Sequence, residues 1–322
     1  MGRAGGQRRL SRLGRAAIRG GALSQPTVRI ALTGATGQVG FELRRALAPL
    51  GEVIVLDRAQ ADLSDATALK AALRAIAPSV IVNPAAYTAV DKAESEPELA
   101  KAINATAPAV MGEVAAALGA LVVHYSTDYV FDGALAKPYQ ETDTTHPQSV
   151  YGQTKWAGEQ ALAATGADYW IFRTAWVIGA RGHNFARTML RLAAERDSLQ
   201  VVSDQVGTPT TAALIADVTA QALHQRLQQG AAAGPNGVYH LTAAGHTSWH
   251  GLACHVITKA LAAGHTLKVT PDQIAAITTA QFPTPAPRPA DSRLSTTKLE
   301  NTFGLTLPDW RVALDHTLEQ IL

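Results

Sequence analysis

The stretch Val28-Arg-Ile-Ala-Leu-Thr-Gly-Ala-Thr-Gly-Gln-Val-Gly40 decides the fold of this chain. Its first half is a short apolar, β-branched run, which is typical of a buried strand. Its second half spaces three glycines as G-x-x-G-x-x-G where a helical stretch, 39–48, begins. In such a turn Gly34 permits a tight bend, Gly37 lets the backbone approach a pyrophosphate, and Gly40 allows close helix–strand packing. Free N–H groups at the helix start favour phosphate, so the pattern predicts a dinucleotide-binding turn.

Strands and helices continue to alternate after this turn. Short apolar runs predict further strands at residues 52–57, 79–83, 120–125 and 169–175. The stretches between them predict helices at residues 66–76, 97–118 and 151–164. Continuous apolar strands separated by helices are typical of a parallel sheet that is covered on both faces. We therefore expect an α/β fold, with a doubly wound parallel (Rossmann) sheet that binds NAD(P) over residues 27–180.

The alternation becomes irregular beyond residue 180. Helices are predicted at residues 184–195, at 211–228 and after Ser248. Four prolines alternate within residues 281–290, which forbids a helix and favours an extended loop. We expect residues 181–322 to form mainly a smaller C-terminal substrate-binding domain, with elements around residues 205–245 returning to the sheet.

The composition excludes several classes of protein. The chain has 322 residues, 47% of them hydrophobic, and a single cysteine provides no disulfide framework. Its longest small-and-apolar stretch, 114–123, is too short to span a membrane. Residues 1–26 hold six arginines and no acidic residue, which leaves 22 basic and 26 acidic residues in the remainder. We expect residues 1–26 to be a disordered basic extension and the rest to be a cytoplasmic protein that binds neither nucleic acid nor membrane.

The residues after the second predicted strand bear on the choice of cofactor. Asp57 ends this strand and Arg58 follows it. An acidic side chain here accepts a hydrogen bond from the ribose 2′-hydroxyl of NAD, whereas a nearby arginine holds the 2′-phosphate of NADP. Asp62 and Leu63 lie in the next loop, where they suit an adenine contact, although Asp62 is almost as typical of a helix N-cap. The expected cofactor is NADPH, with NADH as the alternative.

Tyr151 and Lys155 form the pattern with the most chemical content. Residues four apart on a helix share one face, and an ammonium beside a phenol lowers the pKa of the phenol. Tyr151 is then suited to donate its proton to a carbonyl oxygen whose carbon receives a hydride. Thr127, at the end of the fourth predicted strand, supplies a hydroxyl for the same oxygen, although a capping role is also typical there. These three are the expected catalytic residues.

The glycine-rich turn combined with Tyr-x-x-x-Lys resembles the extended short-chain dehydrogenase/reductase superfamily. Within it, the chain is similar to the dTDP-4-dehydrorhamnose reductases over residues 28 to about 312. The similarity is carried by residues 37–40, 89–97, 124–131, 150–155, 172–177, 184–190, 283–286 and 292–294. It implies NAD(P)H-dependent reduction of the C4 ketone of dTDP-4-dehydro-L-rhamnose, a step in nucleotide-sugar biosynthesis.

The resemblance also implies roles for individual residues. It makes Tyr151 the proton donor, Lys155 its partner and a ligand of the nicotinamide ribose, and Thr127 the hydroxyl that orients the ketone. Sugar contacts are implied for Asp128, Tyr129 and Trp176. The last of these is equally typical of core packing. The expected cofactor contacts come from the glycine-rich turn, from the loops after the next two strands and from Lys155. They are Gly34, Gly37, Gln38, Val39, Gly40, Asp57, Arg58, Asp62, Leu63, Ala86, Tyr87, Thr88 and Lys155.

The charge of the implied substrate predicts two further contacts. A nucleotide-diphosphate sugar is anionic, whereas the chain from Thr27 onward is mildly acidic. Attraction to the pyrophosphate must therefore come from local arginines rather than from the net charge. We expect Arg288 or Arg293 to supply it, so that substitution by alanine raises KM.

The residues expected of a metal site are incomplete. Some members of the family bind Mg²⁺ between subunits through glutamates, and Glu42 occupies one such place, but Ala213 replaces the other glutamate. His246, His250 and Cys254 are spaced four apart, yet the preceding Thr-Ser pair is typical of an N-cap that leaves His246 outside the helix. We therefore expect no metal. Because the family's Mg²⁺ lies between subunits, we also expect a monomer or a weak homodimer.

Two other functions remain open at this point. A non-catalytic, nucleotide-binding regulatory subunit resembles the same family, although the complete Thr127, Tyr151 and Lys155 set argues against it. Another dTDP-4-keto-6-deoxysugar reductase or an epimerase would share most of the motifs. Sugar-nucleotide dehydratases place a glutamate where this chain has Tyr129, so an elimination would lack its base.

Overall fold

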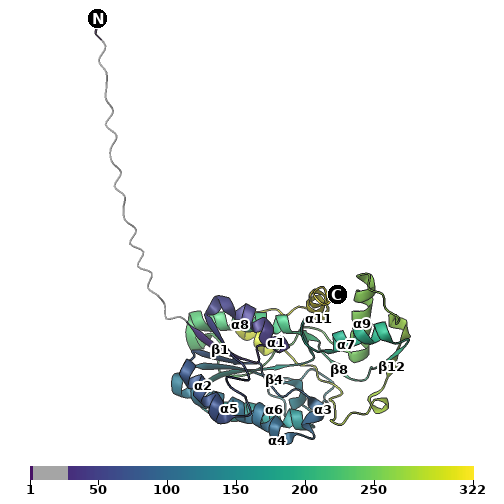
Figure 1. The fold of residues 1–322 in the computed structure, drawn as a ribbon, viewed down its shortest axis with the longest axis horizontal. Helices are drawn as coiled ribbons and strands as arrows, with labels where there is room; N and C mark the ends of the chain where they lie inside the picture. Colours follow the sequence, from purple (N-terminus) through teal and green to yellow (C-terminus); the bar gives the residue numbers. More distant parts are fainter. Residues whose placement is uncertain (3–27) are drawn as a thin grey trace.

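A six-stranded parallel sheet forms the centre of the fold, in the order β10-β5-β4-β3-β1-β2 (Figure 1). The computed structural model describes residues 1–2 and 28–322, so the expected basic extension lies outside the described residues apart from its first two. The strands of the sheet are β1 (Arg29–Thr33), β2 (Glu52–Leu56), β3 (Val80–Asn83), β4 (Leu121–Thr127), β5 (Asp168–Thr174) and β10 (Gly237–His240).

The order of the strands reverses at β1. Ala31 in this strand pairs with Ile54 of β2 on one side and with Ile81 of β3 on the other. The sheet then continues from β3 through β4 and β5 to β10, always in parallel pairs. A doubly wound sheet binds its ligands at such a reversal, outside the carboxyl ends of the strands. The doubly wound parallel sheet predicted from the sequence is confirmed.

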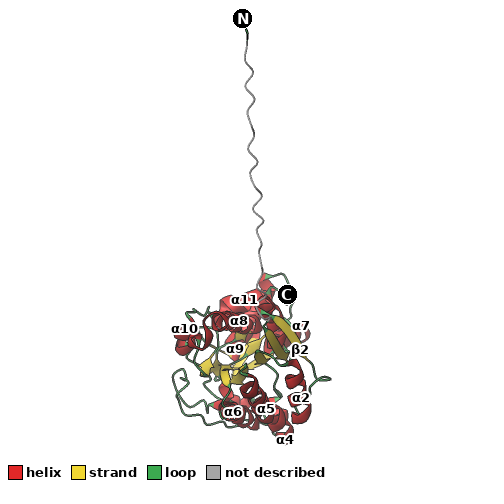
Figure 2. Ribbon diagram, turned by 90° about the vertical axis from the view of Figure 1, so that its left-hand side faces the viewer, coloured by secondary structure: helices red, strands yellow, loops and turns green. Residues whose placement is uncertain are grey.

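Helices cover both faces of this sheet, as Figures 1 and 2 show. On one face, Leu43 of the first helix packs in the same buried cluster as Ile215 of the eighth. On the other face, Leu73 of the second helix shares a buried cluster with Met111 of the fifth. The covering helices are α1 (Gln38–Leu47), α2 (Ala66–Ile76), α5 (Ala107–Leu118), α6 (Val150–Ala163) and α8 (Ala212–Gln229).

The single helix predicted over residues 97–118 is divided in the structure. After α4 (Pro97–Lys101) comes a π-helical turn, η2 (Ala102–Thr106), which leads into α5. Pro108 lacks an N–H group, and its ring would clash with the carbonyl four residues earlier, that of Asn104, in a regular helix. The wider turn relieves this clash. It also brings the Asn104 side chain to the loop after β3, where it bonds the N–H group (2.8 Å) and the carbonyl (3.1 Å) of Tyr87.

Some of the chain after β5 builds a smaller and less regular part, on the right of Figure 1. Met189 of its first helix and Ile257 of its second are buried in one apolar cluster. The helices predicted at 184–195, at 211–228 and after Ser248 are confirmed as α7, α8 and α9. The elements of this part are β6 (Val177–Ile178), α7 (Phe185–Glu195), β7 (Leu199–Val202), β8 (Val206–Gly207), β9 (Thr210–Thr211), β11 (Thr247–Ser248), α9 (Trp249–Ala262), β12 (Ile274–Ile277) and α11 (Trp310–Leu318).

The chain returns to the main sheet after this part has begun. Strand β10 and most of α8 fall within the expected return around residues 205–245. A further helix, α10 (Thr297–Phe303), also packs against the sheet, which the sequence analysis did not predict. Its Phe303 ring lies 5.2 Å from the ring of Trp170 and 5.3 Å from that of Tyr239. The remaining short elements are α3 (Val90–Ala93), η1 (Ala48–Leu50), η3 (Asp128–Val130), η4 (Gly230–Ala233), η5 (Pro271–Gln273) and η6 (Thr279–Gln281).

Within the described residues, no helix combines the length and the apolar character needed to cross a bilayer.

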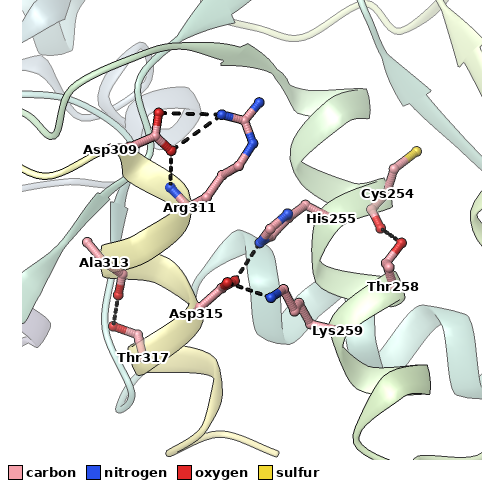
Figure 3. A network of polar contacts seen from close by, with 9 residues as sticks. All are labelled: Cys254, His255, Thr258, Lys259, Asp309, Arg311, Ala313, Asp315 and Thr317. Atoms are coloured by element: carbon pink, nitrogen blue, oxygen red, sulfur yellow. Dashed lines mark hydrogen bonds and ion pairs between the residues drawn. The ribbon is translucent and has the colours of Figure 1, made fainter.

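The last helix, α11, is held on α9 by polar contacts that Figure 3 draws. Asp315 accepts a hydrogen bond from the His255 ring (2.6 Å) and pairs with the Lys259 ammonium (2.5 Å), so one carboxylate joins two residues of the neighbouring helix. Trp310, at the start of α11, is buried and its ring lies 5.0 Å from that of His255.

Asp315→Asn is expected to lower the free energy of unfolding by about 1 kcal/mol, because it removes the charge from two partly exposed contacts. A change of this size lowers Tm by about 2 °C in a chain of this length, which thermal denaturation measures. The matched control is Glu319→Gln at the end of the same helix, where the carboxylate pairs with His316 in an exposed position. This control should leave Tm unchanged, and an equal fall in both variants would contradict the assignment.

Candidate active site

A cavity of about 900 Å³ opens at the carboxyl ends of the central strands, where the order of the sheet reverses. It extends from the glycine-rich turn past the ends of β2 and β3 to the start of α6. Every residue predicted to contact the cofactor lines this cavity except Tyr87. The lining residues that the sequence analysis missed include Thr33, Ala35, Thr36, Val55, Pro84, Ile103, Tyr125, Ser126, Val177, Gly182 and His183.

The glycine-rich turn fits a pyrophosphate. Gly34 has a φ of +57°, and a Cβ atom built there would lie 2.9 Å from the Cβ atom of Ala85. A Cβ atom on Gly40 would lie 2.1 Å from the carbonyl oxygen of Gly34, so α1 could not approach the turn with any larger residue. Gly37 is the N-cap of α1. It supplies no side chain to cap the helix, and the first turn of α1 holds no acidic residue. The first N–H groups of α1 therefore face the cavity without a competing carboxylate.

The acidic and basic side chains after β2 suit the adenosine end of a dinucleotide. Asp57 caps the turn that follows by accepting a hydrogen bond from the N–H group of Gln60 (2.9 Å). Arg58 is largely exposed and lies 3.6 Å from Asp62, leaving its guanidinium accessible to a 2′-phosphate. Asp62 is not the N-cap of α2, a place that Asp65 takes. Two hydrogen bonds from Ser64 lower the pKa of Asp62, which keeps it ionised.

Tyr151 is held at the start of α6 by contacts from two directions. Ser149 is the N-cap and accepts a hydrogen bond from the N–H group of Gly152. The Glu94 carboxylate, from the loop after α3, accepts a hydrogen bond from the N–H group of Val150 (2.9 Å). Side-chain oxygens that accept hydrogen bonds from the first N–H groups of a helix are stabilising. Here they fix the turn of α6 that carries the phenol of Tyr151.

The phenol of Tyr151 is fully protonated at neutral pH. Burial raises its pKa to about 12, against the opposing effect of a hydrogen bond with Thr127. The expected lowering of this pKa by Lys155 is not found in the structure. Burial dominates instead, and spacing on a helix does not reveal how deeply a phenol is buried. A protonated phenol beside a hydroxyl is the state that a proton donor to a carbonyl oxygen requires. Thr127 also accepts a hydrogen bond from the N–H group of Tyr129 (3.2 Å), so it caps as well.

Lys155 lies one turn further along α6 and is buried. Its ammonium donates a hydrogen bond to the carbonyl of Tyr125 (2.6 Å) and lies 3.2 Å from Nε2 of His124. Burial lowers the pKa of Lys155 to about 8, although the carboxylate of Glu159 opposes this shift. A lysine with such a pKa is poised to exchange a proton near neutral pH.

Three of the predicted substrate-binding residues gather beside Tyr151. The rings of Tyr129 and Tyr151 meet edge to face, with centroids 5.5 Å apart. The Arg288 guanidinium lies 5.9 Å from the centroid of Tyr129 and is held by Asp91 at 2.8 Å. Asp128 is buried and accepts a hydrogen bond from Thr127 (2.9 Å), and burial raises its pKa to about 6.

The other two predicted substrate-binding residues, Trp176 and Arg293, and the predicted cofactor contact Tyr87 have different surroundings. Trp176 has a φ of +46° and stacks on Trp249, with ring centroids 3.5 Å apart, so packing accounts for one of its faces. Arg293 is engaged by Asp291 and also donates to the carbonyl of Ala136 (3.0 Å), which turns it toward the 134–137 loop. Tyr87 directs its hydroxyl to Glu96 (2.7 Å).

Several residues that organise the site were missed by the sequence analysis. They are buried or partly buried polar residues whose partners lie far away in the sequence: Asn83, Asp91, Glu94, Asn104 and His124. The available signal was a polar residue inside an apolar strand, as with His124, or a carboxylate in a conspicuous acidic run, as with Glu94. Within residues 28–322, no group of three or more His, Cys, Asp and Glu side chains converges as a metal site would require.

Comparison with known proteins agrees with this geometry. The family model described as the RmlD substrate binding domain matches residues 28–322. The chain belongs to this family. The dTDP-4-dehydrorhamnose reductase of Burkholderia thailandensis is 48% identical over 296 residues, which are 92% of this chain and 99% of that protein. The enzyme of the same name from Salmonella typhimurium is 49% identical over 298 residues, 91% of this chain and 98% of that protein.

Solved structures of RmlD-family proteins also match the fold. A dTDP-4-dehydrorhamnose reductase from Clostridium acetobutylicum superposes with a TM-score of 0.83 at 37% identity, covering 91% of this chain and 99% of the other. The enzyme of that name from Bacillus anthracis, solved in complex with NADP, has a TM-score of 0.83 at 32% identity, covering 92% and 100%. A UDP-glucose 4-epimerase from Thermus thermophilus, at 20% identity and a TM-score of 0.75, shares the fold.

Proposed function

We propose that this chain reduces the C4 ketone of dTDP-4-dehydro-L-rhamnose to give dTDP-L-rhamnose, with NADPH as the reductant. The observation that carries the proposal is a cavity with the glycine-rich turn at one end and Tyr151 and Lys155 at the other, with the Thr127 hydroxyl hydrogen-bonded to Tyr151 behind its wall. Curated relatives about 48% identical to the chain bear the name of this reductase. The cofactor belongs to the sheet, residues 27–180, and the sugar lies between the catalytic residues of the sheet and the residues after 180.

The residues of the chain divide the chemistry among them. NADPH, when bound, supplies a hydride to the C4 carbon of the sugar and leaves as NADP⁺. As that carbon–hydrogen bond forms, the carbonyl π electrons move to oxygen, and Tyr151 gives this oxygen its phenolic proton. The Thr127 hydroxyl fixes the oxygen beside Tyr151, and Lys155 stabilises the phenolate until solvent returns a proton.

The surroundings of the sugar favour reduction over elimination. An elimination would require a carboxylate at the position of Tyr129, whose pKa burial raises, so that the side chain stays neutral and can only pack or donate. Arg288 lies next to Tyr129 with Asp91 as its anchor, which suits a contact with the substrate pyrophosphate. Arg293 contacts the substrate pyrophosphate only if it first breaks its ion pair with Asp291.

NADPH suits this site because of the donors after β2. The Bacillus anthracis relative was solved with NADP. In this chain the exposed guanidinium of Arg58 suits the 2′-phosphate, while Asp57 is engaged with the Gln60 turn and is not aimed solely at a ribose hydroxyl. NADH is the alternative reductant, and Asp57 would then accept a hydrogen bond from its ribose 2′-hydroxyl.

The activity is tested by following the absorbance of NADPH in the presence of dTDP-4-dehydro-L-rhamnose. We expect oxidation that needs both compounds and yields dTDP-L-rhamnose, identified by NMR. Oxidation that yields the 6-deoxytalose epimer would assign the chain to a related reductase. Binding of NADPH without turnover at any pH would instead favour a regulatory nucleotide-binding subunit and contradict the proposal.

We also propose that the protein acts in the cytoplasm on this small nucleotide sugar, as a monomer or a weak homodimer and without Mg²⁺. Glu42, the residue at a family metal position, lies 3.5 Å from Arg45, which also pairs with Asp217. Ala213 provides no carboxylate to complete such a site. Light scattering after size exclusion should give the same mass with MgCl₂ and with EDTA, and a dimer that forms only with MgCl₂ would refute this.

A further inference from the structure

A buried chain of polar side chains leads away from Lys155 across three neighbouring strands. Nζ of Lys155, on α6, lies 3.2 Å from Nε2 of His124 on β4. Nδ1 of the same ring lies 3.0 Å from the amide nitrogen of Asn83, at the end of β3. The amide oxygen of Asn83 accepts a hydrogen bond from the hydroxyl of Thr33, at the end of β1 (2.6 Å). All four residues are at least 98% buried.

The direction of the hydrogen bonds along this chain depends on the charge of Lys155. Lys155 as an ammonium can only donate, so Nε2 of His124 must accept and Nδ1 must carry the ring proton. Nδ1 then donates to the amide oxygen of Asn83, whose amide nitrogen turns toward Thr33. Lys155 as a neutral amine can accept, so Nε2 carries the proton, Nδ1 accepts from the amide nitrogen, and Thr33 donates to the amide oxygen.

Both directions keep the four side chains paired with one another without moving the backbone. An asparagine amide presents a donor and an acceptor that exchange by rotation, and a neutral imidazole has two tautomers. The ring must remain neutral for this, and burial together with the ammonium of Lys155 holds the pKa of His124 well below its usual range. A carboxylate in place of the Asn83 amide would allow only one direction, because it can only accept.

We propose that Thr33, Asn83 and His124 form a reversible hydrogen-bond support that holds Lys155 in one place in both its charged and its neutral form. His124 is thus a positioning residue that acts through Lys155. The inference deepens the proposed function and rests on it for the catalytic role of Lys155. The support lets the lysine change its charge with pH without losing a partner.

The other titratable groups around Lys155 do not reverse in this way. Glu159, on the same helix, is committed to a buried pair with Arg173 of β5 (2.6 Å). Tyr151, one turn away, keeps its proton because burial raises its pKa to about 12. Burial raises the pKa of Asp128, beyond Thr127, to about 6, so this carboxyl does not titrate where Lys155 does.

The tautomer of His124 tests the support directly, in protein without cofactor or substrate. Nitrogen-15 NMR of histidine-labelled protein distinguishes a protonated ring nitrogen from an accepting one. We expect the proton on Nδ1 at pH 6.5 and on Nε2 at pH 9.5, because Lys155 loses its charge around pH 8. A tautomer that stays the same across this range would overturn the proposal, whether or not the protein proves to be a reductase.

His240 provides an internal control in the same spectra. It is also buried and neutral, since burial lowers its pKa to about 3, but its Nδ1 faces the fixed carbonyl of Tyr139 (3.1 Å). Its tautomer should therefore remain Nδ1–H at both values of pH. The His124→Gln variant, which lacks one set of signals, assigns the resonances.

Two substitutions separate support from packing. His124→Phe keeps a planar ring but removes both polar atoms, whereas His124→Gln keeps a reversible amide and loses the ring. We expect kcat at pH 8 to fall about tenfold in the Phe variant, with the alkaline limb of the pH profile about one unit lower and KM nearly unchanged. The Gln variant should stay within about threefold of the parent. A Phe variant as active as the Gln variant would show that the ring only packs and would overturn the proposal.

Discussion

Tyr151→Phe is expected to lower kcat by about 10³-fold, because it removes the phenolic proton that lies beside Thr127 for transfer to the ketone oxygen. Phenylalanine keeps the ring that packs against Tyr129, so the fold and the cavity should be unchanged. The dissociation constant for NADPH, measured by fluorescence, should change less than about threefold. Steady-state kinetics at pH 7 measure the loss of kcat.

Tyr239→Phe is the matched control for this variant. It removes a hydroxyl that donates to the carbonyl of Pro235 (2.6 Å) at the far end of the sheet. A modest loss of stability, about 1 kcal/mol, with kcat preserved is expected. Full activity in Tyr151→Phe would show that another group donates the proton, and equal losses in both variants would show that kcat reports only stability.

Gly34→Ala is expected to weaken NADPH binding on the order of 10²-fold. The new Cβ atom would lie 2.9 Å from the Cβ atom of Ala85 and would require a φ of +57°, so the turn must move away from the pyrophosphate position. A displacement of about 1 Å at such a contact has effects of this size. Isothermal titration with NADPH measures the change in the dissociation constant.

Gly119→Ala separates the clash from the backbone conformation. Gly119 has a φ of +66°, close to that of Gly34, but a Cβ atom there would meet nothing within 4 Å. This control should lose about 1 kcal/mol of stability and no NADPH affinity. Equal weakening of NADPH binding in the two variants would mean that the glycine-rich turn does not hold the cofactor.

The fold was predictable because its strongest signals are local. The strand, the glycine spacing and the helix of residues 28–48 are contiguous, and each later strand is an apolar run bounded by a helix. The division of residues 97–118 was less accessible, because it depends on how Pro108 and the contacts of Asn104 are accommodated in three dimensions. The packing of α10 against Trp170 and Tyr239 joins segments far apart in the sequence, which periodicity does not reveal.

The candidate site was predictable in its residue types but not in its electrostatics. Tyr151 and Lys155 are recognisable by their spacing, and Thr127 by its place at a strand end. Burial, which raises the pKa of Tyr151 and lowers that of Lys155, depends on the whole fold. The support of Lys155 by His124 and Asn83 also requires the register of β3 and β4, which places these two residues side by side.

In the proposed reaction, hydride passes from NADPH to C4 of the sugar in a site built by Tyr151, Thr127 and Lys155. Its most direct test uses NADPH carrying deuterium at C4 of the nicotinamide, with dTDP-4-dehydro-L-rhamnose as substrate. We predict dTDP-L-rhamnose with one deuterium at C4, detected by NMR and mass spectrometry, and no transfer by Tyr151→Phe beyond its residual rate. Deuterium that appears at another carbon, or that stays in the cofactor while the sugar is released unreduced, would rule this reaction out.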